Sequence, residues 1–327
     1  MGQCCSDQGL PDLSAKTDLQ KIQIYGPADC VILDNEQVQQ KFNDEIKIQI
    51  NLDEYKKKYL IEEKDNIQYQ RVALPYLKLK CGLVYKGQWK NKKMDGYGQI
   101  IIPSSKVYYC GEFEQGIVQG SGIIIHSNGD IYEGNFKNFA ADKYGEFKGV
   151  NGEQYKGQWQ NDQKHGRGVY QDQLYKYEGD FERGIKQGQG TLEFYDVFKY
   201  KGSFQNNMFE GNGELEYLDG SKRKYIGEFN QNKKSGNGHF IWPLCEYKGQ
   251  YQDDQRNGMG EIQFVEGIKV SGMFVNGQLN DDNAKIHIGD NEIQAKFTNG
   301  IIVSDNGGLS DQIKQLFILN DFDENIY

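Results

Sequence analysis

Hydrophobic and polar positions in the middle of the chain repeat in steps of 22 to 25 residues. Each unit opens with a tyrosine, places a glycine two positions later and an aromatic residue two positions after that, and fills the gaps with mostly polar residues. A fixed period of this size indicates an array in which each unit packs on its neighbours, without a single central core. The units begin at Tyr85, Tyr109, Tyr132, Tyr155, Tyr177, Tyr200, Tyr225 and Tyr247.

The clearest copy runs from Tyr155 to Gly168 and predicts a β-hairpin. A strand over its first part would carry Tyr155, Gly157 and Trp159 on one face. The glycine between the two aromatic residues leaves room for a ring to lie flat over the backbone. A polar loop of about six residues, a Gly-x-Gly pair and a second, often β-branched run follow. Two strands joined by a glycine-bearing loop form a hairpin.

Three stretches depart from this pattern. The third unit reads Gly145-Glu-Phe147, so we expect that its second glycine is replaced and that its hairpin is looser or bulged. The stretch 270–274 has lost its tyrosine and its Gly-x-Gly pair, where Asp281 and Asp282 stand, and residues 293–297 echo the strand without any glycine. We expect both to be degenerate terminal units.

Tyr-x-Gly-x-aromatic, a polar loop and Gly-x-Gly at this period resemble the MORN repeat (membrane occupation and recognition nexus). The resemblance covers eight units, a little over half of the chain. We expect an all-β fold, an elongated, twisted, single-layer antiparallel ribbon of about eight to nine MORN hairpins. Membership would imply roles at membrane–cytoskeleton junctions, with homodimers of the ribbon. Some MORN proteins belong to ciliary radial spokes, and others are phosphoinositide kinases.

The flanks of the array suggest four parts. Residues 1–15 form an N-terminal tail, and residues 16–84 form a cap of mixed structure over the first open edge. Residues 85–272 form the array, and residues 273–327 hold the degenerate repeats, a capping helix and an acidic tail. Ser310 is the expected N-cap of that short helix, which ends near Leu319. The alternatives are a second functional domain in 16–84 and a partner-binding role for the helix.

The first six residues, Met1-Gly2-Gln3-Cys4-Cys5-Ser6, fit the N-myristoylation pattern. One myristoyl chain binds membranes weakly, on the order of 10⁴ M⁻¹, so stable anchoring needs a second signal. Residues 1–15 contain no Lys or Arg, which leaves S-palmitoylation of Cys4 and Cys5 as the local candidate. We therefore expect lipidation at Gly2, Cys4 and Cys5, with an unmodified cytosolic N-terminus as the alternative.

Charge and cysteine content limit the classes of partner and the cellular compartment that the sequence favours. Residues 271–327 carry 3 Lys and Arg against 9 Asp and Glu, a net charge of −6, whereas the array is near neutral. This balance argues against nucleic acid as the main partner. None of the six cysteines forms a Cys-x-x-Cys pair, so free thiols in the cytosol are expected. The N-terminus lacks a hydrophobic signal core and no apolar run is long enough to span a bilayer, which predicts a chain that is neither secreted nor transmembrane.

The sequence motifs typical of nucleotide-binding and metal-binding sites are incomplete or absent in this sequence. Gly188-Gln-Gly190 lacks the third glycine of a dinucleotide-binding loop, and there is no Walker A pattern. The four histidines are scattered singly. The stretch 321–325 begins like a calcium loop but has no glycine and no bidentate glutamate. The sequence therefore predicts no enzyme, no cofactor, and no catalytic or metal-binding residues.

Two kinds of binding surface are expected. The candidate lipid headgroup contacts are Lys92, Lys93, Lys164, Arg167, Lys233 and Lys234. These basic loops fall three units apart, and sheet twist would rotate them by roughly 120–150°, so solvated loops are the simpler interpretation. The exposed aromatic edge of an open ribbon is the favoured docking surface, for another copy or for an amphipathic partner.

These observations predict a membrane-anchored, non-catalytic scaffold. It would recruit or organise protein partners at the cytosolic face of the plasma membrane or another membrane, in a ciliary or cortical position. Its expected partners are the membrane through its acyl chains, proteins or a second copy along the ribbon, and phosphoinositides, but not nucleic acid. The alternatives are a ciliary or axonemal structural component and a regulatory phosphoinositide-binding module for a separate lipid kinase.

Overall fold

The computed structural model describes residues 30–32, 70–310 and 313. These residues form β-strands joined by short turns, and the strand pairs within each unit are antiparallel, so the predicted all-β fold class is confirmed. The chain divides into two compact units. Unit 1 contains the residues up to Gln173 together with Phe181–Ile185, and unit 2 contains Leu174–Asp180 and the residues from Lys186 onward. The predicted acylated tail, most of the predicted cap and most of the predicted C-terminal helix lie outside the described residues.

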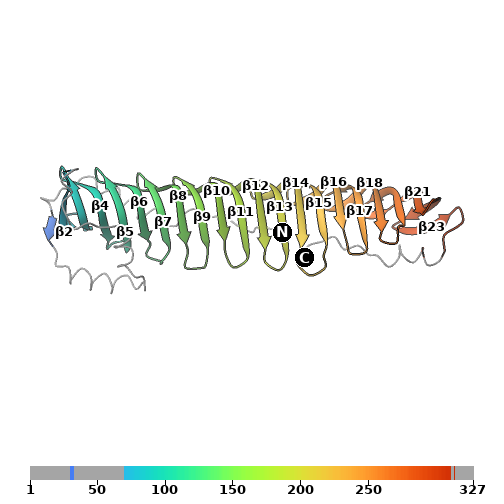
Figure 1. The fold of residues 1–327 in the computed structure, drawn as a ribbon, viewed down its shortest axis with the longest axis horizontal. Coiled ribbons are helices and arrows are strands. Elements are labelled where there is room, and N and C mark those ends of the chain that lie inside the picture. The colour runs from blue at the N-terminus through green and yellow to red at the C-terminus, as the bar shows by residue number, and fades with distance from the viewer. Residues whose placement is uncertain (1–29, 33–69, 311–312, 314–327) are drawn as a thin grey trace. The chain divides into compact units, whose positions relative to one another are not determined.

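The strands of unit 1 pair in chain order from β2 to β10, and β1 pairs with β2 (Figure 1). Strand β2 lies in the segment predicted as a cap, and it extends the sheet before the first repeat. The strands are β1 (Cys30–Ile32), β2 (Val72–Leu79), β3 (Val84–Lys90), β4 (Lys93–Ile102), β5 (Val107–Glu114), β6 (Ile117–Ile125), β7 (Ile131–Lys137), β8 (Ala140–Lys148), β9 (Gln154–Gln160) and β10 (Gln163–Gln171).

Strand β11 (Tyr175–Glu182) carries residues of both units. In unit 2 the strands from β12 to β19 pair in chain order, β19 pairs with both β20 and β21, and β21 to β23 continue in order. These strands are β12 (Ile185–Phe194), β13 (Phe198–Gln205), β14 (Met208–Tyr217), β15 (Lys224–Asn230), β16 (Lys233–Ile241), β17 (Cys245–Gln252), β18 (Gln255–Phe264), β19 (Lys269–Val275), β20 (Gln278–Leu279), β21 (Asp281–Ile288), β22 (Asn291–Thr298) and β23 (Ile301–Asp305).

Each hairpin reverses through only two residues. Between β9 and β10 these are Asn161 and Asp162, with φ of 49° and 66°. Two successive positive φ angles define a type I′ turn, whose twist matches that of the flanking strands. The predicted loop of about six polar residues is therefore wrong: most of that segment is strand, and Gly166 and Gly168 both lie inside β10.

A β-bulge lies a few residues after the turn. In the β9–β10 pair the register shifts between Lys164 and Gly168. Gly166 has φ of +57° there, and the N–H of Arg167 donates to Oε1 of Gln158 at 3.2 Å. The Gln158 side chain thus satisfies a backbone donor that the bulge removes from the strand ladder. The equivalent acceptors in other hairpins are Gln88, Glu112, Glu228 and Gln250.

In the third hairpin, β7–β8, a lysine occupies the left-handed position of the bulge. Lys143 has φ of 66°, close to the 57° of Gly166. Gly145 pairs with Gly134 and lies beneath the ring of Tyr132, as the second glycine does in the neighbouring hairpins. The expectation that the second glycine is replaced is therefore wrong. The first glycine of the pair is the one that is replaced, by Lys143, and the second is retained as Gly145. The bulge is also present in the hairpins on either side, so it is not particular to this unit.

The aromatic residues form the core, as the alternation predicted. Tyr155 is 0% exposed and makes edge-to-face contacts with Trp159 and Phe181, with ring centroids 5.0 and 5.2 Å apart. A Cβ added to Gly157 or Gly168 would overlap the Tyr155 ring, so the ring lies directly over the two glycines. The same buried tyrosine recurs in each unit at Tyr85, Tyr109, Tyr132, Tyr177, Tyr200, Tyr225 and Tyr247.

At the C-terminal end, β19–β20 and β21–β22 form hairpins that lack the tyrosine of the repeat. β19 buries Phe274 and reverses at Asn276 and Gly277, and Leu279 returns to the core from the short β20. Oδ2 of Asp281 accepts the N–H of Met273 at 2.8 Å. At the expected helix start, the N–H of Ile313 lies 3.4 Å from Oγ of Ser310. No helix in the described part of the chain is long and apolar enough to cross a membrane.

Candidate interaction surface

Reciprocal hydrogen bonds join the turn of one hairpin to the second strand of the preceding hairpin, along one edge of the sheet. The backbone N–H of Asp162 donates to the carbonyl of Ala141 at 3.0 Å, and Oδ1 of Asp162 accepts the N–H of Ala141 at 2.6 Å. The carboxylate therefore serves a backbone donor that has no strand partner. The same reciprocal pair joins Asn207 to Lys186, Asn232 to Phe209, and Asp254 to Lys234.

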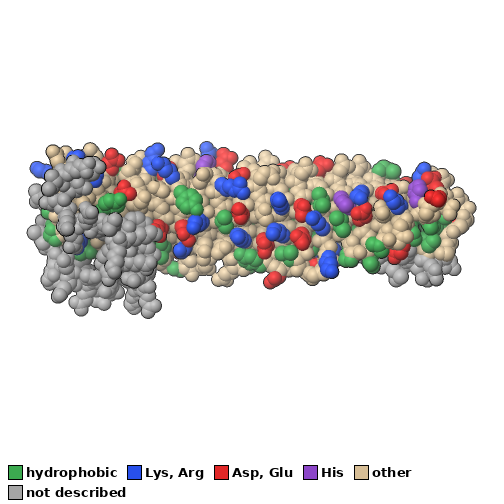
Figure 2. Space-filling view, in the orientation of Figure 1, with side chains coloured by type: hydrophobic (Ala, Val, Ile, Leu, Met, Phe, Trp, Pro, Cys, Tyr) green, Lys and Arg blue, Asp and Glu red, His purple; other side chains and the backbone are tan. Residues whose placement is uncertain are grey.

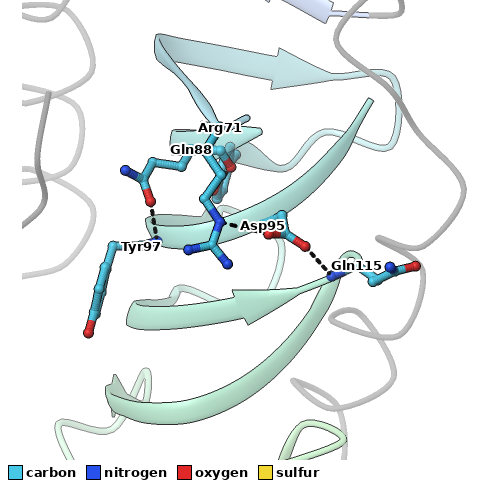
Figure 3. Close-up of polar contacts among 6 residues, drawn as sticks. Arg71, Gln88, Asp95, Tyr97 and Gln115 are labelled. Atoms are coloured by element: carbon cyan, nitrogen blue, oxygen red, sulfur yellow. Dashed lines mark hydrogen bonds and ion pairs between the residues drawn. The ribbon is translucent and has the colours of Figure 1, made fainter. Parts of the chain in front are cut away.

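A second kind of contact, in which a strand side chain accepts the N–H of a turn, occurs at the start of unit 1. Nε of Arg71 lies 2.8 Å from Oδ1 of Asp95, and Oδ2 of Asp95 accepts the N–H of the turn residue Gln115 at 3.1 Å (Figure 3). Figure 3 also shows Gln88 accepting the N–H of Tyr97 in the first bulge. Asp95 is buried, so its charge depends on the Arg71 guanidinium and the turn N–H for stabilisation. The Asp95 carboxylate thus connects Arg71, just before β2, to the turn between β5 and β6.

Several basic side chains are buried where other hairpins place hydrophobic ones. Lys186 is 2% exposed; its Nζ lies 4.7 Å from the ring centroid of Tyr175 and 3.2 Å from the Tyr175 hydroxyl. Cation–π attraction and this hydrogen bond replace part of the hydration that the ammonium group loses. The carbonyls of the residues at this position accept the N–H of the next turn, which identifies the set as Met94, Val118, Ala141, Lys164, Lys186, Phe209, Lys234, Arg256 and Leu279.

The structure places two of the six predicted headgroup residues in the core and leaves four exposed. Lys164 and Lys234 are buried, and their ammonium groups lie 4.3 Å from the ring centroid of Tyr170 and 5.1 Å from that of Phe240. Lys164 also pairs with Glu153 at 3.2 Å. These two ammonium groups are therefore committed to the core, which the expectation of basic loops missed. The exposed members of the set are Lys92, Lys93, Arg167 and Lys233. Headgroup binding by those four stays a prediction.

Charged side chains of both signs alternate across the strands of unit 2, on the face opposite the tyrosines. Nζ of Lys224 lies 2.6 Å from Glu214, and Glu246 contacts both Lys248 at 2.7 Å and Nε2 of His239 at 2.8 Å. Hydrogen bonds from Lys248 and His239 lower the pKa of Glu246. Figure 2 shows such blue and red side chains lying next to one another on the face in view. Exposed pairs of this kind contribute about 0–1 kcal/mol each, so they give this face solubility more than stability.

In the first repeats of unit 1, the strand face opposite the tyrosines is buried. Gln99, Cys110 and Ile123 are aligned across β4 to β6, and all three are buried. The hydroxyls of Tyr108 and Tyr76 converge on Oε1 of Gln99 at 3.2 and 3.4 Å. Both faces of the sheet therefore contribute to the core at this end, whereas one face does so in the later repeats.

The other edge of unit 2, formed by the turns between repeats, exposes hydrophobic side chains. Adjacent turns are hydrogen-bonded through the backbone: Tyr195 N–H to the Leu174 carbonyl at 3.1 Å, and Val265 N–H to the Leu244 carbonyl at 3.1 Å. The predicted exposed aromatic edge is therefore wrong, because the repeat aromatics are core and this edge is mainly aliphatic. We call these residues the apolar edge: Leu174, Tyr195, Leu218, Leu244 and Val265.

Burial keeps several side chains of the core in their neutral form. Among residues 30–32, 70–310 and 313, no three His, Cys, Asp or Glu side chains cluster as metal ligands would. Burial raises the pKa of the core tyrosines Tyr155 and Tyr177, so their hydroxyls stay protonated and donate to backbone carbonyls. Burial also raises the pKa of the Cys245 thiol to about 12, which leaves it a poor nucleophile at neutral pH.

A family model for the MORN repeat matches seven segments, at residues 85–106, 109–131, 155–173, 177–196, 200–222, 225–243 and 247–269. Residues 132–154 fall between two matched segments, and they contain the β7–β8 hairpin in which Lys143 replaces a glycine. The structure thus supplies the eighth hairpin predicted from the tyrosine spacing, with Tyr132 and Phe136 packed edge to face.

The chain is also similar to curated relatives and solved structures. It is 29% identical over 127 residues to alsin from Homo sapiens and from Mus musculus; the match covers 36% of this chain and 8% of alsin. The TCP domain of SAS-4 from Drosophila melanogaster, solved with a proline-rich motif of Ana2, matches with a TM-score of 0.26 and 14% identity, over 52% of this chain and 84% of that one. A mutant TCP10 domain of CPAP from Danio rerio matches with a TM-score of 0.24 and 8% identity, over 75% and 93%. With seven matched repeats and the same hairpin in an eighth unit, residues 85–269 form an array of MORN repeats.

Proposed function

We propose that this protein is a non-catalytic scaffold, held at the cytosolic face of a membrane by acylation of Gly2, Cys4 and Cys5. Its repeats would hold protein partners close to that membrane. The proposal joins two parts of the chain: a lipidation motif in the first six residues, and an array whose polar core groups are committed to the fold.

The scaffold role is supported by the observation that the residues of the repeat motif form the core of the sheet. In each of the eight units the tyrosine ring covers two glycines and its hydroxyl donates to a backbone carbonyl. The buried basic residues pack on those rings. The residues that define the repeat therefore stabilise the sheet, and specificity is left to its exposed edges and faces.

The membrane anchor is tested by expressing Gly2→Ala with a C-terminal fluorescent tag and separating membrane from cytosol. Myristoylation requires the Gly2 amine, so we expect this variant to move to the cytosol. Cys4→Ser/Cys5→Ser retains one weak anchor and should be distributed between both fractions. Gly9→Ala, in the same tail, is the matched control and should behave as wild type. Membrane retention of Gly2→Ala would contradict the anchor.

The scaffold role is tested by proximity labelling at the membrane with wild type and with Gly2→Ala. If the protein recruits partners, a set of proteins labelled by wild type should be lost from the membrane fraction with the variant. An unchanged set would show that recruitment does not depend on this chain being anchored.

A further inference from the structure

The apolar edge of unit 2 is a regular row of exposed hydrophobic side chains. Its five members are between 36% and 66% exposed, and each comes from a different turn between repeats. Backbone hydrogen bonds between successive turns hold members of the row next to one another, as Tyr195 N–H to Leu174 and Val265 N–H to Leu244 show. Single exposed hydrophobic residues are ordinary, but an aligned series of this size is typical of an interaction site.

The spacing of the row suits a helix. Successive turns are separated by two strands, or about 9.6 Å, and sheet twist lengthens that step at the edge. Residues seven apart on an α-helix are about 10.5 Å apart, on nearly the same side. A helix lying along the edge would therefore offer one apolar side chain per repeat, over about 38 Å for the five positions.

The net charge of unit 2 indicates the charge that a partner of this edge carries. The described residues of unit 2 carry 14 Lys and Arg against 19 Asp and Glu, a net charge of −5, whereas those of unit 1 carry 15 against 11, a net of +4. Within the row, Asp196 follows Tyr195 and Glu266 follows Val265, and both acidic side chains are exposed. The acidic field of unit 2 therefore attracts a cationic ligand to the edge and opposes an anionic lipid surface.

We propose that the apolar edge of unit 2 is a docking site for a basic amphipathic helix of a protein partner. Apolar side chains of the helix would cover Leu174, Tyr195, Leu218, Leu244 and Val265, while its flanking lysines and arginines would face Asp196 and Glu266. This inference rests on the proposed scaffold function and states the chemistry of what the scaffold holds. A second copy of unit 2 is the less suitable occupant, since its edge would bring the same negative charge.

The test uses the full chain, prepared without lipid, so that its outcome is independent of the Gly2→Ala result. The probe is a fluorescein-labelled amphipathic helical peptide of about 28 residues, which spans about 42 Å as a helix. It has leucines on one face and lysines flanking them, and a counterpart peptide has glutamate for each lysine. Fluorescence anisotropy at about 150 mM salt limits contributions from distant charges.

Two triple variants separate the apolar edge from the rest of the surface. Leu174→Ser/Leu244→Ser/Val265→Ser removes hydrophobic contacts from the edge, and we expect the lysine peptide to bind it at least 10-fold more weakly than wild type. The control Ile226→Ser/Met259→Ser/Met273→Ser removes hydrophobic residues that are 40–54% exposed on the strand face opposite the tyrosines, and it should bind as wild type. Equal unfolding midpoints show that both variants are folded; if the edge triple is not, Leu244→Ser alone replaces it, with an expected weakening of about 3-fold.

The charge requirement is tested with Asp196→Asn/Glu266→Gln and with the glutamate peptide. We expect a severalfold loss of affinity for the first and at least a 10-fold loss for the second. The proposal is overturned if the edge variant binds the lysine peptide as wild type does, if the face control loses the same affinity, or if the glutamate peptide binds equally well. It is also overturned if wild type, but not the edge variant, sediments with phosphatidylserine vesicles or forms a dimer in analytical ultracentrifugation, since a membrane or a second copy would then occupy the edge.

Discussion

The hydroxyl of Tyr155 donates a hydrogen bond to the backbone carbonyl of Gln158 at 2.8 Å, and the ring between them covers Gly157 and Gly168. This contact explains why the first position of the repeat is tyrosine and not phenylalanine. The ring needs glycine beneath it, and the hydroxyl satisfies a carbonyl next to the bulge. The repeat motif is thus a local packing unit with its own hydrogen bond.

Tyr155→Phe should lower the free energy of unfolding by about 0.5–1.5 kcal/mol, because the ring stays in place and only the hydrogen bond is lost. Trp159 contacts Tyr155, so tryptophan fluorescence during urea unfolding includes a signal from this unit. Tyr195→Phe, at an exposed tyrosine, is the control and should leave the midpoint unchanged. Equal midpoints for Tyr155→Phe and wild type would show that the hydroxyl contributes no net stability.

Lys143→Gly should stabilise the protein by about 1 kcal/mol. Lys143 holds φ of 66°, a conformation that costs a side-chain-bearing residue roughly 1–2 kcal/mol, while the glycine loses more backbone entropy on folding. Urea unfolding compares it with Lys156→Gly, which places glycine at an exposed strand position in β9 and should destabilise by about 0.5–1 kcal/mol. If both variants are less stable than wild type, the left-handed strain at Lys143 is not a cost to the fold.

The fold and the core were predictable because the alternation of aromatic, glycine and polar residues that specifies them is complete within each unit. Alternation of period two places Tyr155, Gly157 and Trp159 on one face whatever the neighbouring units do. The turns were harder to predict from the sequence. Asn161 and Asp162 look like part of a polar loop, and the type I′ turn is recognised only from their two successive left-handed φ angles. Asparagine and aspartate tolerate that conformation, so their recurrence at this position was the available signal.

The buried basic residues show the limit of interpreting each unit alone. A lysine two residues after a turn suggests a solvated loop, so a single unit gives no sign that Lys186 is buried. Alignment of the units would have placed it in a position that also holds Met94 and Phe209. The apolar edge depends likewise on neighbouring turns, since Leu244 and Val265 become adjacent only through pairing between repeats.

Asp162→Ala should destabilise by about 1–3 kcal/mol, because it leaves the N–H of buried Ala141 without its 2.6 Å acceptor. The turn φ of 66° also disfavours alanine, so Asp162→Gly is needed to separate the two effects. Glycine keeps the turn but removes the acceptor, and should retain most of the loss. Asp162→Asn should be near neutral, since Asn207 and Asn232 make the same contact elsewhere.

Hydrogen exchange of the Ala141 amide would measure the coupling between the two hairpins directly. We expect faster exchange in Asp162→Gly than in Asp162→Asn. If the two variants exchange at the same rate, the reciprocal pair does not hold the turns together.

Cys81, which is exposed, should be alkylated by iodoacetamide at neutral pH, while the buried Cys110 and Cys245 should be protected in the folded protein. Cys245 is protected twice, by burial and by a pKa of about 12 that leaves little thiolate. Peptide mapping by mass spectrometry gives the extent of modification at each site, and addition of urea should expose all three. Rapid labelling of Cys245 without denaturant would contradict its place in the core.

Lys186→Met should change the free energy of unfolding by less than about 1 kcal/mol, whereas Lys186→Glu should lower it by about 3 kcal/mol or more. Methionine fills a position that Met94 and Leu279 occupy in other hairpins, and replacing a buried charge by a well-packed apolar side chain is often neutral. Glutamate places a negative charge against the ring of Tyr175 and loses the hydrogen bond to its hydroxyl. Lys176→Glu, exposed in β11, is the charge-matched control and should stay within about 0.5 kcal/mol of wild type. Equal losses for Lys186→Glu and Lys176→Glu would mean that charge reversal in acidic unit 2, and not burial against tyrosine, determines the effect.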